Sequence, residues 1–502
     1  MVTTANILVY ITITIGFIFL YIMYYNGSIT LCDVDKVVQK TTKKKKGDYE
    51  MKKRLIIKII AVAISAMMLM LAACGNGGDD PVDPPEDPPE VTEDPPEDDD
   101  DEDPPLEVDP GTDGVLNVLI WDANQQPGIQ QIIDAFTAET GIEVEIQVIP
   151  WGDYWTLLEA AAGGGDMPDV MWMHSNEVQR YMSAGLLLDL TDFLPGSQVN
   201  MAGFPQDIID LYAYDGRYYA VPKDIDTIAI WYNVGMFEEA GIDFPNESWT
   251  WEDFYDAAVA LTDGAGQYGV AWGPGNNQDG YYNVIYSMGG YVINDARDAS
   301  GYDNPYTIEA MLFVERLIQN GGLPVEVRGL DDQHVHFEAG TVGMITMGSW
   351  MIPAFRDNPY FVENARVAVL PMAANTGRRV SIYNGLGWAA SAATDMPDEA
   401  KALIEWFGTE AMQIKQAELG VTMSAYQGTS DAWAGNIDAF DVEPYFIMLD
   451  DVVLRPYSRA TGAWEFPIND IFAQVWAGEI TMLEGLEQAA ALMNEALADE
   501  LR

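Results

Sequence analysis

The chain has 502 residues, and its 79 Asp and Glu against 25 Lys and Arg give a formal net charge of −54. Acidic residues outnumber basic ones throughout residues 115–502, so the surface repels the phosphates of nucleic acids, which excludes a DNA or RNA partner. Such a lysine-poor surface also suits a salty or alkaline habitat, a hypothesis that unchanged folding stability between low and molar salt would contradict.

Two apolar runs precede the acidic part of the chain. Residues 6–25 are about long enough to span a bilayer. Residues 55–71 follow the basic Met51-Lys52-Lys53-Arg54 and end in small residues, a pattern typical of a secretory signal peptide. A complete signal peptide is not expected to begin so far into a chain, so we interpret residues 1–50 as a mis-assigned start, with an extra membrane segment as the alternative.

The second run ends in Leu71-Ala72-Ala73-Cys74, which resembles the lipobox where bacterial lipoproteins are cleaved and acylated. The resemblance implies that residues 51–73 are a lipoprotein signal peptide and that Cys74 carries lipid at the extracellular face of the cell membrane, the periplasmic side if the host has an outer membrane. Each buried CH₂ of an acyl chain contributes roughly 0.8 kcal/mol, so several chains anchor a protein firmly.

Residues 74–114 form a segment of a different composition, with Pro-Pro pairs set among Asp and Glu. Low hydrophobicity and like charges keep such a segment unfolded. At about 3.1 Å per residue it reaches on the order of 120 Å, so we interpret it as a tether, with weak Ca²⁺ binding as the alternative. Cys74 is the only cysteine after residue 73, which excludes an intrachain disulfide in the mature form.

The remaining residues open as an α/β protein. Residues 115–121 are a nearly continuous apolar run, as in a strand buried on both faces. Apolar residues then recur at helical spacing up to Gly141, and an alternating strand over 144–148 follows. Strand, helix and strand in this order predict a βαβ unit with a parallel sheet, and residues 169–173 predict a third strand.

Several short segments, in the same order along the chain, resemble family 1 extracellular solute-binding proteins. Within residues 116–495 they are 137–144 (TAETGIEV), 163–170 (GGGDMPDV), 216–222 with 230–233 (GRYYAVP and IWYN), 241–254 (GIDFPNESWTWEDF) and 337–350 (FEAGTVGMITMGSW). Gly343 departs from the alanine that is common in the family. The group includes sugar-binding lipoproteins of ABC transporters, with maltose-binding protein as a distant relative.

The resemblance implies a type II-like periplasmic-binding-protein fold, in which each of two α/β lobes has a mainly parallel sheet flanked by helices. We expect crossings near residues 221–226, 379–385 and 421–425. Lobe 1 is then 115–223 plus 383–422, and lobe 2 is 224–382 plus 423–502. The ligand cleft lies between the lobes, which close around it by a hinge motion.

Ligands of open α/β sheets bind at the carboxyl ends of strands. The candidate positions are these strand ends, the crossings, and the place where relatives bring a C-terminal helix to the ligand. Aromatic rings cover the flat C–H faces of sugars, and carboxylates and amides bond their hydroxyl rims, although the same aromatic residues also serve as core. The candidate ligand-binding residues are Trp121, Asp122, Ser175, Asn176, Asp226, Tyr232, Tyr282, Trp350, Tyr383, Asn384, Trp464 and Glu465.

The resemblance implies a monomer that captures a carbohydrate, expected to be an oligosaccharide, and delivers it to the permease subunits of an ABC importer. The same fold binding a polyamine, a peptide or another solute remains an alternative. A glycoside-acting enzyme, in which paired carboxylates would act as acid and base, is disfavoured. The family resemblance runs nearly end to end without a catalytic module, and the chain has no hydrolase motif such as G-x-S-x-G or H-E-x-x-H. His334 and His336 lack an apparent third ligand, and we expect no metal and no cofactor.

Overall fold

A computed structural model describes residues 22–25, 28–31, 108, 112, 114–324 and 333–501. Residues 1–101 and 102–502 form separate units. In the first unit Ile22–Tyr25 (β1) pairs antiparallel with Ser28–Leu31 (β2), so the end of the predicted membrane-spanning run is a strand. The rest of that run, the signal peptide, Cys74 and residues 75–107 lie outside the described residues. Within the described ranges, no helix is long and apolar enough to cross a membrane.

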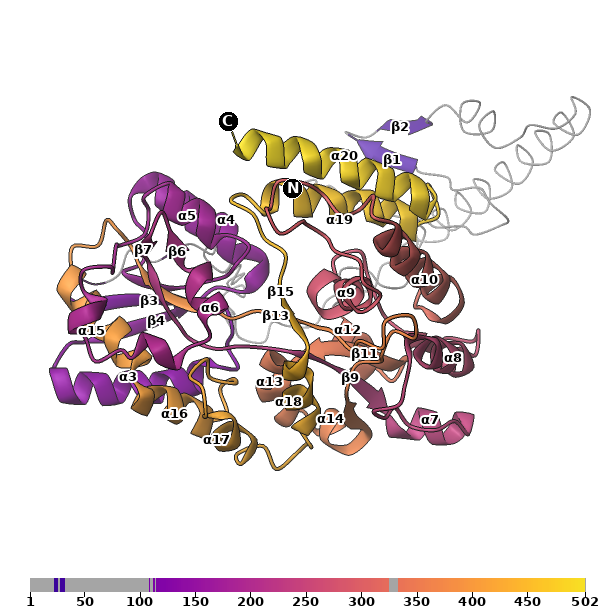
Figure 1. The fold of residues 1–502 in the computed structure, drawn as a ribbon, viewed down its shortest axis with the longest axis horizontal. Helices are drawn as coiled ribbons and strands as arrows, with labels where there is room; N and C mark the ends of the chain where they lie inside the picture. The colour runs from indigo at the N-terminus through magenta and orange to yellow at the C-terminus, as the bar shows by residue number, and fades with distance from the viewer. Residues whose placement is uncertain are drawn as a thin grey trace, which may run out of the picture. The chain divides into compact units, whose positions relative to one another are not determined.

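A five-stranded sheet forms the centre of what we call the first lobe (Figure 1). Its strands, in spatial order, are β4 (Val144–Val148), β3 (Leu116–Ile120), β5 (Val170–Met173), β14 (Gly387–Ala390) and β8 (Ala220–Pro222). The pairs β3–β4 and β3–β5 are parallel, as predicted, whereas β14 runs antiparallel to both β5 and β8.

Helices cover both faces of this sheet because strand side chains alternate between the faces. Leu116, Val118 and Ile120 pack with the apolar side of α3 (Gln126–Thr140), which ends at Gly141 with φ 74°, as predicted. Leu119 and Met171 point the other way and pack with α4 (Trp151–Gly164). The lobe also contains α5 (Val178–Ser183), α6 (Gln206–Leu211), α15 (Pro397–Gly408) and α16 (Glu410–Glu418).

The second lobe is built on a four-stranded sheet in the order β10 (Tyr268–Val270), β11 (Val342–Gly348), β9 (Ile228–Asn233) and β12 (Ala365–Ala368). Here only β10 and β11 are parallel, and β9 is antiparallel to both of its neighbours. The two-lobe α/β class is as predicted, but this sheet is more mixed than expected. Since β9 leaves the crossing and β11 returns towards it, the residues after β11 lie near the start of β9.

Further helices surround this second sheet or pack on its helices, and α17 (Ser430–Ala434) contacts α16 of the first lobe. Trp249 and Trp251 are buried where α8 begins. Thr250 and Thr481 each form a reciprocal capping box, so two of the helices begin at well-defined residues. The helices are α7 (Val234–Ala240), α8 (Trp251–Leu261), α9 (Tyr282–Ser287), α10 (Pro305–Gly321), α12 (Gln333–Glu338), α13 (Ile352–Arg356), α14 (Pro359–Asn364), α17 (Ser430–Ala434), α18 (Glu443–Ile447), α19 (Gly462–Trp476) and α20 (Met482–Glu500).

Several chain segments pass between the two sheets. The chain leaves β8 at Pro222 and enters β9 at Ile228. It returns through β13 (Ser381–Tyr383), which pairs in parallel with β15 (Val452–Leu454), a segment that the sequence did not single out. Single-residue bridges join Asp226 to Asn384 and Asp224 to Ser424, so the segments support one another. The exact partition into lobes stays a prediction.

Candidate ligand-binding site

The carboxyl ends of four strands bring a set of polar and aromatic residues together. Trp121 follows β3, His174 follows β5, Asn384 follows β13 and Arg455 follows β15. The Nδ2 atom of Asn384 lies 2.8 Å from Nε2 of His174, and the Trp121 and His174 rings lie 6.4 Å apart. This is the edge at which open α/β sheets bind their ligands.

One side of this site is a group of tryptophan rings. The Trp121 ring lies 5.2 Å from Trp151, 5.9 Å from Trp155 and 5.0 Å from Trp172. Trp172 is fully buried, Trp121 is half-buried, and Trp151, at the start of α4, is 45% exposed. The cluster therefore presents a flat apolar ring at its outer end while its inner rings hold that ring in place.

The centre of the site is polar. Asp226 accepts hydrogen bonds from the backbone N–H of Asn384 at 3.1 Å and from the Gln278 side chain at 3.3 Å. Burial and the neighbouring Asp224 raise the pKa of Asp226 well above its ordinary value. Burial and nearby Arg455 lower the pKa of His174, so its ring stays neutral.

The second lobe contributes a buried ion pair to the site. Arg455 donates through Nη2 to both carboxylate oxygens of Glu465, at 2.6 and 2.8 Å, and Asn277 donates to the same carboxylate at 2.9 Å. Other buried polar atoms around the site have no hydrogen-bond partner within the described part of the chain. They are Nε and Nη1 of Arg455, Oδ1 of Asn176, Oδ1 of Asn384 and Oγ of Ser175. Buried polar atoms are normally hydrogen-bonded, so these donors and acceptors are suited to a bound polar solute.

The structure brings some of the predicted residues together. Trp121, Asp226, Asn384 and Glu465 belong to the groups described above, and Ser175 with Asn176 follows His174. Asp122, next to Trp121, is half-buried and accepts hydrogen bonds from the backbone of Asn124 and the side chain of Gln125, each at 2.8 Å. Its role as a ligand residue stays a prediction.

Three predicted residues lie in the apolar core instead. Tyr232 packs on Phe237 and Phe244, with ring distances of 5.4 Å. Tyr282 is 1% exposed, with its hydroxyl 3.4 Å from that of Tyr302. Trp464 is fully buried and donates from its indole to Ser458. Their rings fill the second lobe, the common role of large aromatic residues, so the structure does not place them with the others.

Trp350 and Tyr383 lie at the borders of the site. Trp350 is half-buried after β11, and its ring lies so close over Gly348 that any Cβ there would clash with it. The Ser349 N–H donates to the carbonyl of Thr227 at 3.1 Å, which ties this turn to the first crossing. Tyr383 is 4% exposed and packs in an apolar cluster of the first lobe.

Sequence reasoning missed Trp151, His174, Asn277, Gln278 and Arg455. His174 and Arg455 each directly follow a strand, and the chain has 3 His in all, so rarity and position together were a usable signal. Trp151 follows Pro150 at a helix start, a weaker signal. Asn277 and Gln278 lie in a π-helical turn that no sequence pattern marked. The described residues, which include His334 and His336, contain no group of three or more His, Cys, Asp or Glu placed to hold a metal ion.

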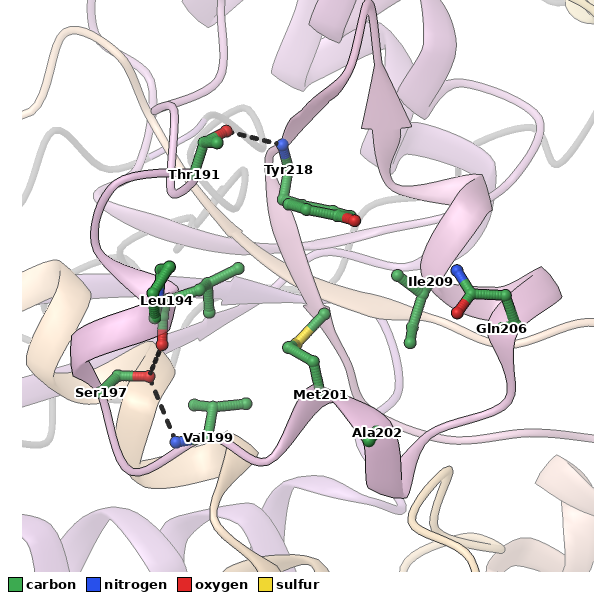
Figure 2. A pocket seen from close by; sticks show the side chains of 10 residues that line it. Thr191, Leu194, Ser197, Val199, Met201, Ala202, Gln206, Ile209 and Tyr218 are labelled. Atoms are coloured by element: carbon green, nitrogen blue, oxygen red, sulfur yellow. Dashed lines mark hydrogen bonds between the residues drawn. The ribbon is translucent and has the colours of Figure 1, made fainter.

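Two cavities lie elsewhere on the molecule. One, of about 410 Å³, is lined by Thr191, Leu194, Pro195, Ser197, Val199, Met201, Ala202, Gln206, Ile209 and Tyr218 (Figure 2). The other, of about 650 Å³, lies between residues 459–463 and the end of α20. Neither contains a predicted ligand residue. In the first, the Ser197 hydroxyl and the Tyr218 N–H are already hydrogen-bonded within the protein, so we do not place the solute there.

The chain is similar in sequence to known sugar-binding proteins. The chain is 28% identical over 312 residues to the maltotriose-binding protein of Pyrococcus abyssi, which covers 60% of this chain and 64% of that protein. It is 23% identical over 289 residues to the galactooligosaccharide-binding protein of Bacillus subtilis, which covers 54% and 63%. The matches thus span a little under two thirds of the length of these relatives.

Solved structures show the same fold. An ABC substrate-binding protein from Listeria monocytogenes in complex with cycloalternan superposes with a TM-score of 0.69 at 20% identity, covering 76% of this chain and 98% of that one. Residues 122–414 match the family described as bacterial extracellular solute-binding protein. With more than half of its length matched in this way, the chain belongs to the bacterial extracellular solute-binding proteins.

Proposed function

We propose that this chain is an extracellular binding protein that captures an oligosaccharide between its two lobes and delivers it to the permease of an ABC importer. The observation that carries the proposal is the half-exposed tryptophan cluster beside buried hydrogen-bonding groups that lack protein partners. The relatives support it, since they are named for maltotriose and galactooligosaccharides, and the Listeria monocytogenes protein binds cycloalternan.

The site chemistry fits a sugar. A pyranose ring offers a flat C–H face, which the exposed ring of Trp151 can cover. Its hydroxyl groups both donate and accept, and the site offers Arg455 as a donor and Asn176, Asn384 and Asp226 as acceptors. A micromolar affinity corresponds to roughly −8 kcal/mol, which a stacked ring and several hydrogen bonds to buried groups can provide.

The proposed mechanism is capture without a chemical step. The first lobe offers the tryptophan cluster and the second lobe offers Arg455, Glu465 and Gln278. The segments that pass between the sheets are short and bridge one another at Asp226–Asn384 and Asp224–Ser424, so rotation about them would bring the two half-sites onto a solute. The permease would recognise the closed, ligand-bound form.

The proposal includes anchoring by lipid on Cys74 and a monomeric state. The lipobox Leu71-Ala72-Ala73-Cys74 supports the anchor. Metabolic labelling with a radioactive fatty acid should tag the expressed chain, and Cys74→Ser should abolish the label. Light scattering after size-exclusion chromatography should give the mass of one chain, and the mass of a dimer would contradict the proposed monomeric state.

The test of ligand capture is Trp151→Ala against a matched control. Trp151 is 45% exposed at the site, whereas Tyr306 is 53% exposed at the start of α10, outside the site. Calorimetric titration with a panel of mono- and oligosaccharides should show a Trp151→Ala affinity at least tenfold below that of the wild type, with an unchanged thermal midpoint. Tyr306→Ala should bind normally. Equal affinities of all three proteins would remove Trp151 from the site.

A further inference from the structure

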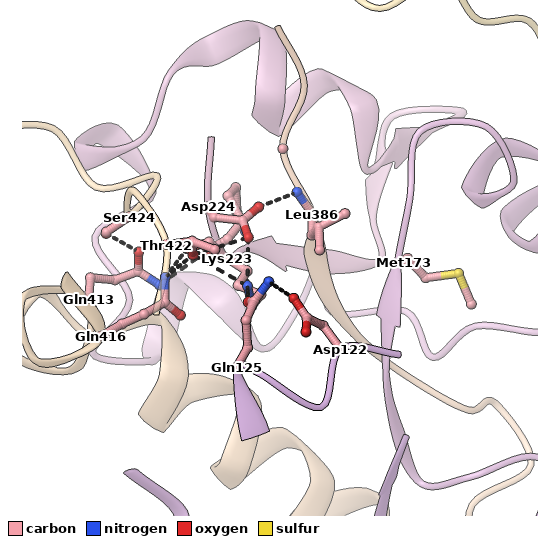
Figure 3. Close-up of polar contacts among 12 residues, drawn as sticks. Asp122, Gln125, Met173, Lys223, Asp224, Leu386, Gln413, Gln416, Thr422 and Ser424 are labelled. Atoms are coloured by element: carbon pink, nitrogen blue, oxygen red, sulfur yellow. Dashed lines mark hydrogen bonds and ion pairs between the residues drawn. The ribbon is translucent and has the colours of Figure 1, made fainter. Parts of the chain in front are cut away.

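Lys223 is wholly buried immediately after β8, at the first crossing. Its ammonium group lies 2.6 Å from the carboxylate of Asp224 and 2.9 Å from Oε1 of Gln125 (Figure 3). It also lies 4.4 Å from the centre of the Trp172 ring. Lysine is among the residues least often buried, and a buried ion pair adds little stability over an apolar pair of the same size. Stability alone therefore does not explain this lysine.

The ammonium group fixes the direction of a chain of hydrogen bonds. It carries only donors, so Gln125 must turn Oε1 towards it. The amide nitrogen of Gln125 is then directed at Oδ2 of Asp122, 2.8 Å away, and the backbone N–H of Asn124 donates to Oδ1. Both carboxylate oxygens of Asp122 are thus held by donors, and their remaining lone pairs are left to accept hydroxyl groups beside Trp121.

The other end of the same network holds the crossing segments. Asp224 accepts the N–H of Leu386 through Oδ1 at 2.8 Å and the hydroxyl of Thr422 through Oδ2 at 3.3 Å. The Gln416 side chain donates to the carbonyl of Lys223 at 3.0 Å. These contacts join the first crossing to the strand that returns from the second lobe and to residues 416–424. The Lys223–Asp224 ion pair therefore lies between Asp122 and the backbone next to Asp226.

We propose that Lys223 is a positioning residue, which fixes the Gln125 amide and through it holds the Asp122 carboxylate as a hydrogen-bond acceptor for a ligand hydroxyl group next to Trp121. This role rests on the proposed function in one respect, the identity of the ligand. The orientation of Asp122 does not depend on it. The assignment makes Gln125, which touches no expected ligand, a determinant of affinity.

Gln125→Glu separates positioning from folding. The new carboxylate still bonds Lys223, which offsets its repulsion from Asp122, so the thermal midpoint should stay near that of the wild type. It no longer donates to Asp122, however, and repels it, so affinity for the oligosaccharide should fall at least tenfold at neutral pH. As the pH is lowered and the pair of carboxyl groups takes up a proton, a hydrogen bond between them returns and affinity should recover in part. A purely structural residue would show no such pH-dependent recovery.

Thr422→Val is the matched control, because Thr422 contacts Lys223 at 3.5 Å but lies off the path to Asp122. It should bind the sugar with wild-type affinity. If Gln125→Glu binds as tightly as the wild type at neutral pH, or if Thr422→Val loses as much affinity, the positioning role is overturned.

A second measurement needs no ligand. The double variant Lys223→Met/Asp224→Asn keeps the volumes and leaves an acceptor for Leu386. In its crystal structure the Gln125 amide should be turned and the Asp122 carboxylate rotated from its wild-type position. An unmoved Asp122 would overturn the proposal whether or not a sugar is known. A rotated Asp122 in a protein whose wild type binds no sugar would leave the positioning role standing and overturn the proposed function instead.

Discussion

Two clusters of aromatic rings, one in each lobe, differ in how far they are exposed. In the first lobe the rings around Trp121 run from buried Trp172 outward to Trp151, which is 45% exposed. In the second lobe Trp272, Tyr281 and Phe472 are all fully buried and pack on one another or on their neighbours in the core. The residue types are the same, so type alone does not mark a binding face. We propose that it is marked instead by a position at the carboxyl end of a strand together with one ring left exposed.

Two ion pairs of the molecule also differ in how far they are exposed to water. Arg455 and Glu465, at the site, have side chains only 4% and 6% exposed. Arg378 and Asp451 form a pair with the same 2.6 Å contact, but with side chains 43% and 34% exposed. A short distance therefore says little by itself, because water screens one pair and not the other.

The largest expected effect comes from breaking the buried pair. Arg455→Met leaves the Glu465 carboxylate buried without its partner, which should lower the free energy of unfolding by about 3–5 kcal/mol. Arg378→Met breaks the exposed pair and should cost about 0–1 kcal/mol. Urea denaturation of both variants measures the difference. Equal losses would show that the contrast between buried and exposed pairs does not hold here.

A comparable effect should distinguish two rings on one helix. Phe472 is fully buried in α19 and Phe466 is 54% exposed in the same helix. Phe472→Ala should destabilise the protein by about 3–5 kcal/mol through lost burial and the cavity left behind. Phe466→Ala should change the free energy of unfolding by no more than about 0.5 kcal/mol. Denaturant titration gives both values, and a large loss for Phe466→Ala would mean that its ring is covered in solution.

A smaller effect is expected from the pH dependence of Asp226. Burial and Asp224 raise its pKa well above 3.8, so the folded chain keeps this proton to a higher pH than the unfolded chain. Its contribution to stability is fully present below about pH 4 and is lost as the pH rises through the folded-state pKa. Asp226→Asn should therefore raise the free energy of unfolding at neutral pH while weakening ligand binding.

Asp263 is a control of opposite sign. Hydrogen bonds from the backbone of Ala265 and Gln267 lower the pKa of this exposed carboxyl group. Its stabilising contribution is present above its ordinary pKa and is lost as the pH falls, so Asp263→Asn should lower stability at neutral pH. Denaturant titrations at a series of pH values measure the free energy of unfolding of both variants. A decrease for Asp226→Asn at neutral pH would mean that its hydrogen bonds outweigh its burial.

The fold was predictable where local pattern and family resemblance agreed. The apolar run at 115–121 and the helical spacing up to Gly141 gave the βαβ unit because strands buried on both faces and amphipathic helices leave clear periodicities. Strand direction in the second sheet was not predictable in this way. It depends on where β9 and β11 return in space, which no local pattern records.

The site was predictable in part for the same reason. Trp121 and Asn384 directly follow strands, so their place at the carboxyl edge follows from the chain order. Tyr282 and Trp464 lie at the starts of helices, where the sequence does not show which way a ring points, and only packing shows that their rings face the core. His174 was missed because its partner, Asn384, is distant in the chain. Arg455 was missed because it joins the site, with its partner Glu465, only once β15 pairs with β13.

The most direct test is the thermal unfolding midpoint of the purified protein against a panel of mono- and oligosaccharides, with polyamines and peptides alongside. A solute that binds only the folded chain raises the midpoint with its concentration. The account predicts a rise with one family of oligosaccharides, and at any given concentration a much smaller rise in Trp151→Ala. A rise with polyamines or peptides alone, or an equal rise in the variant, would contradict it.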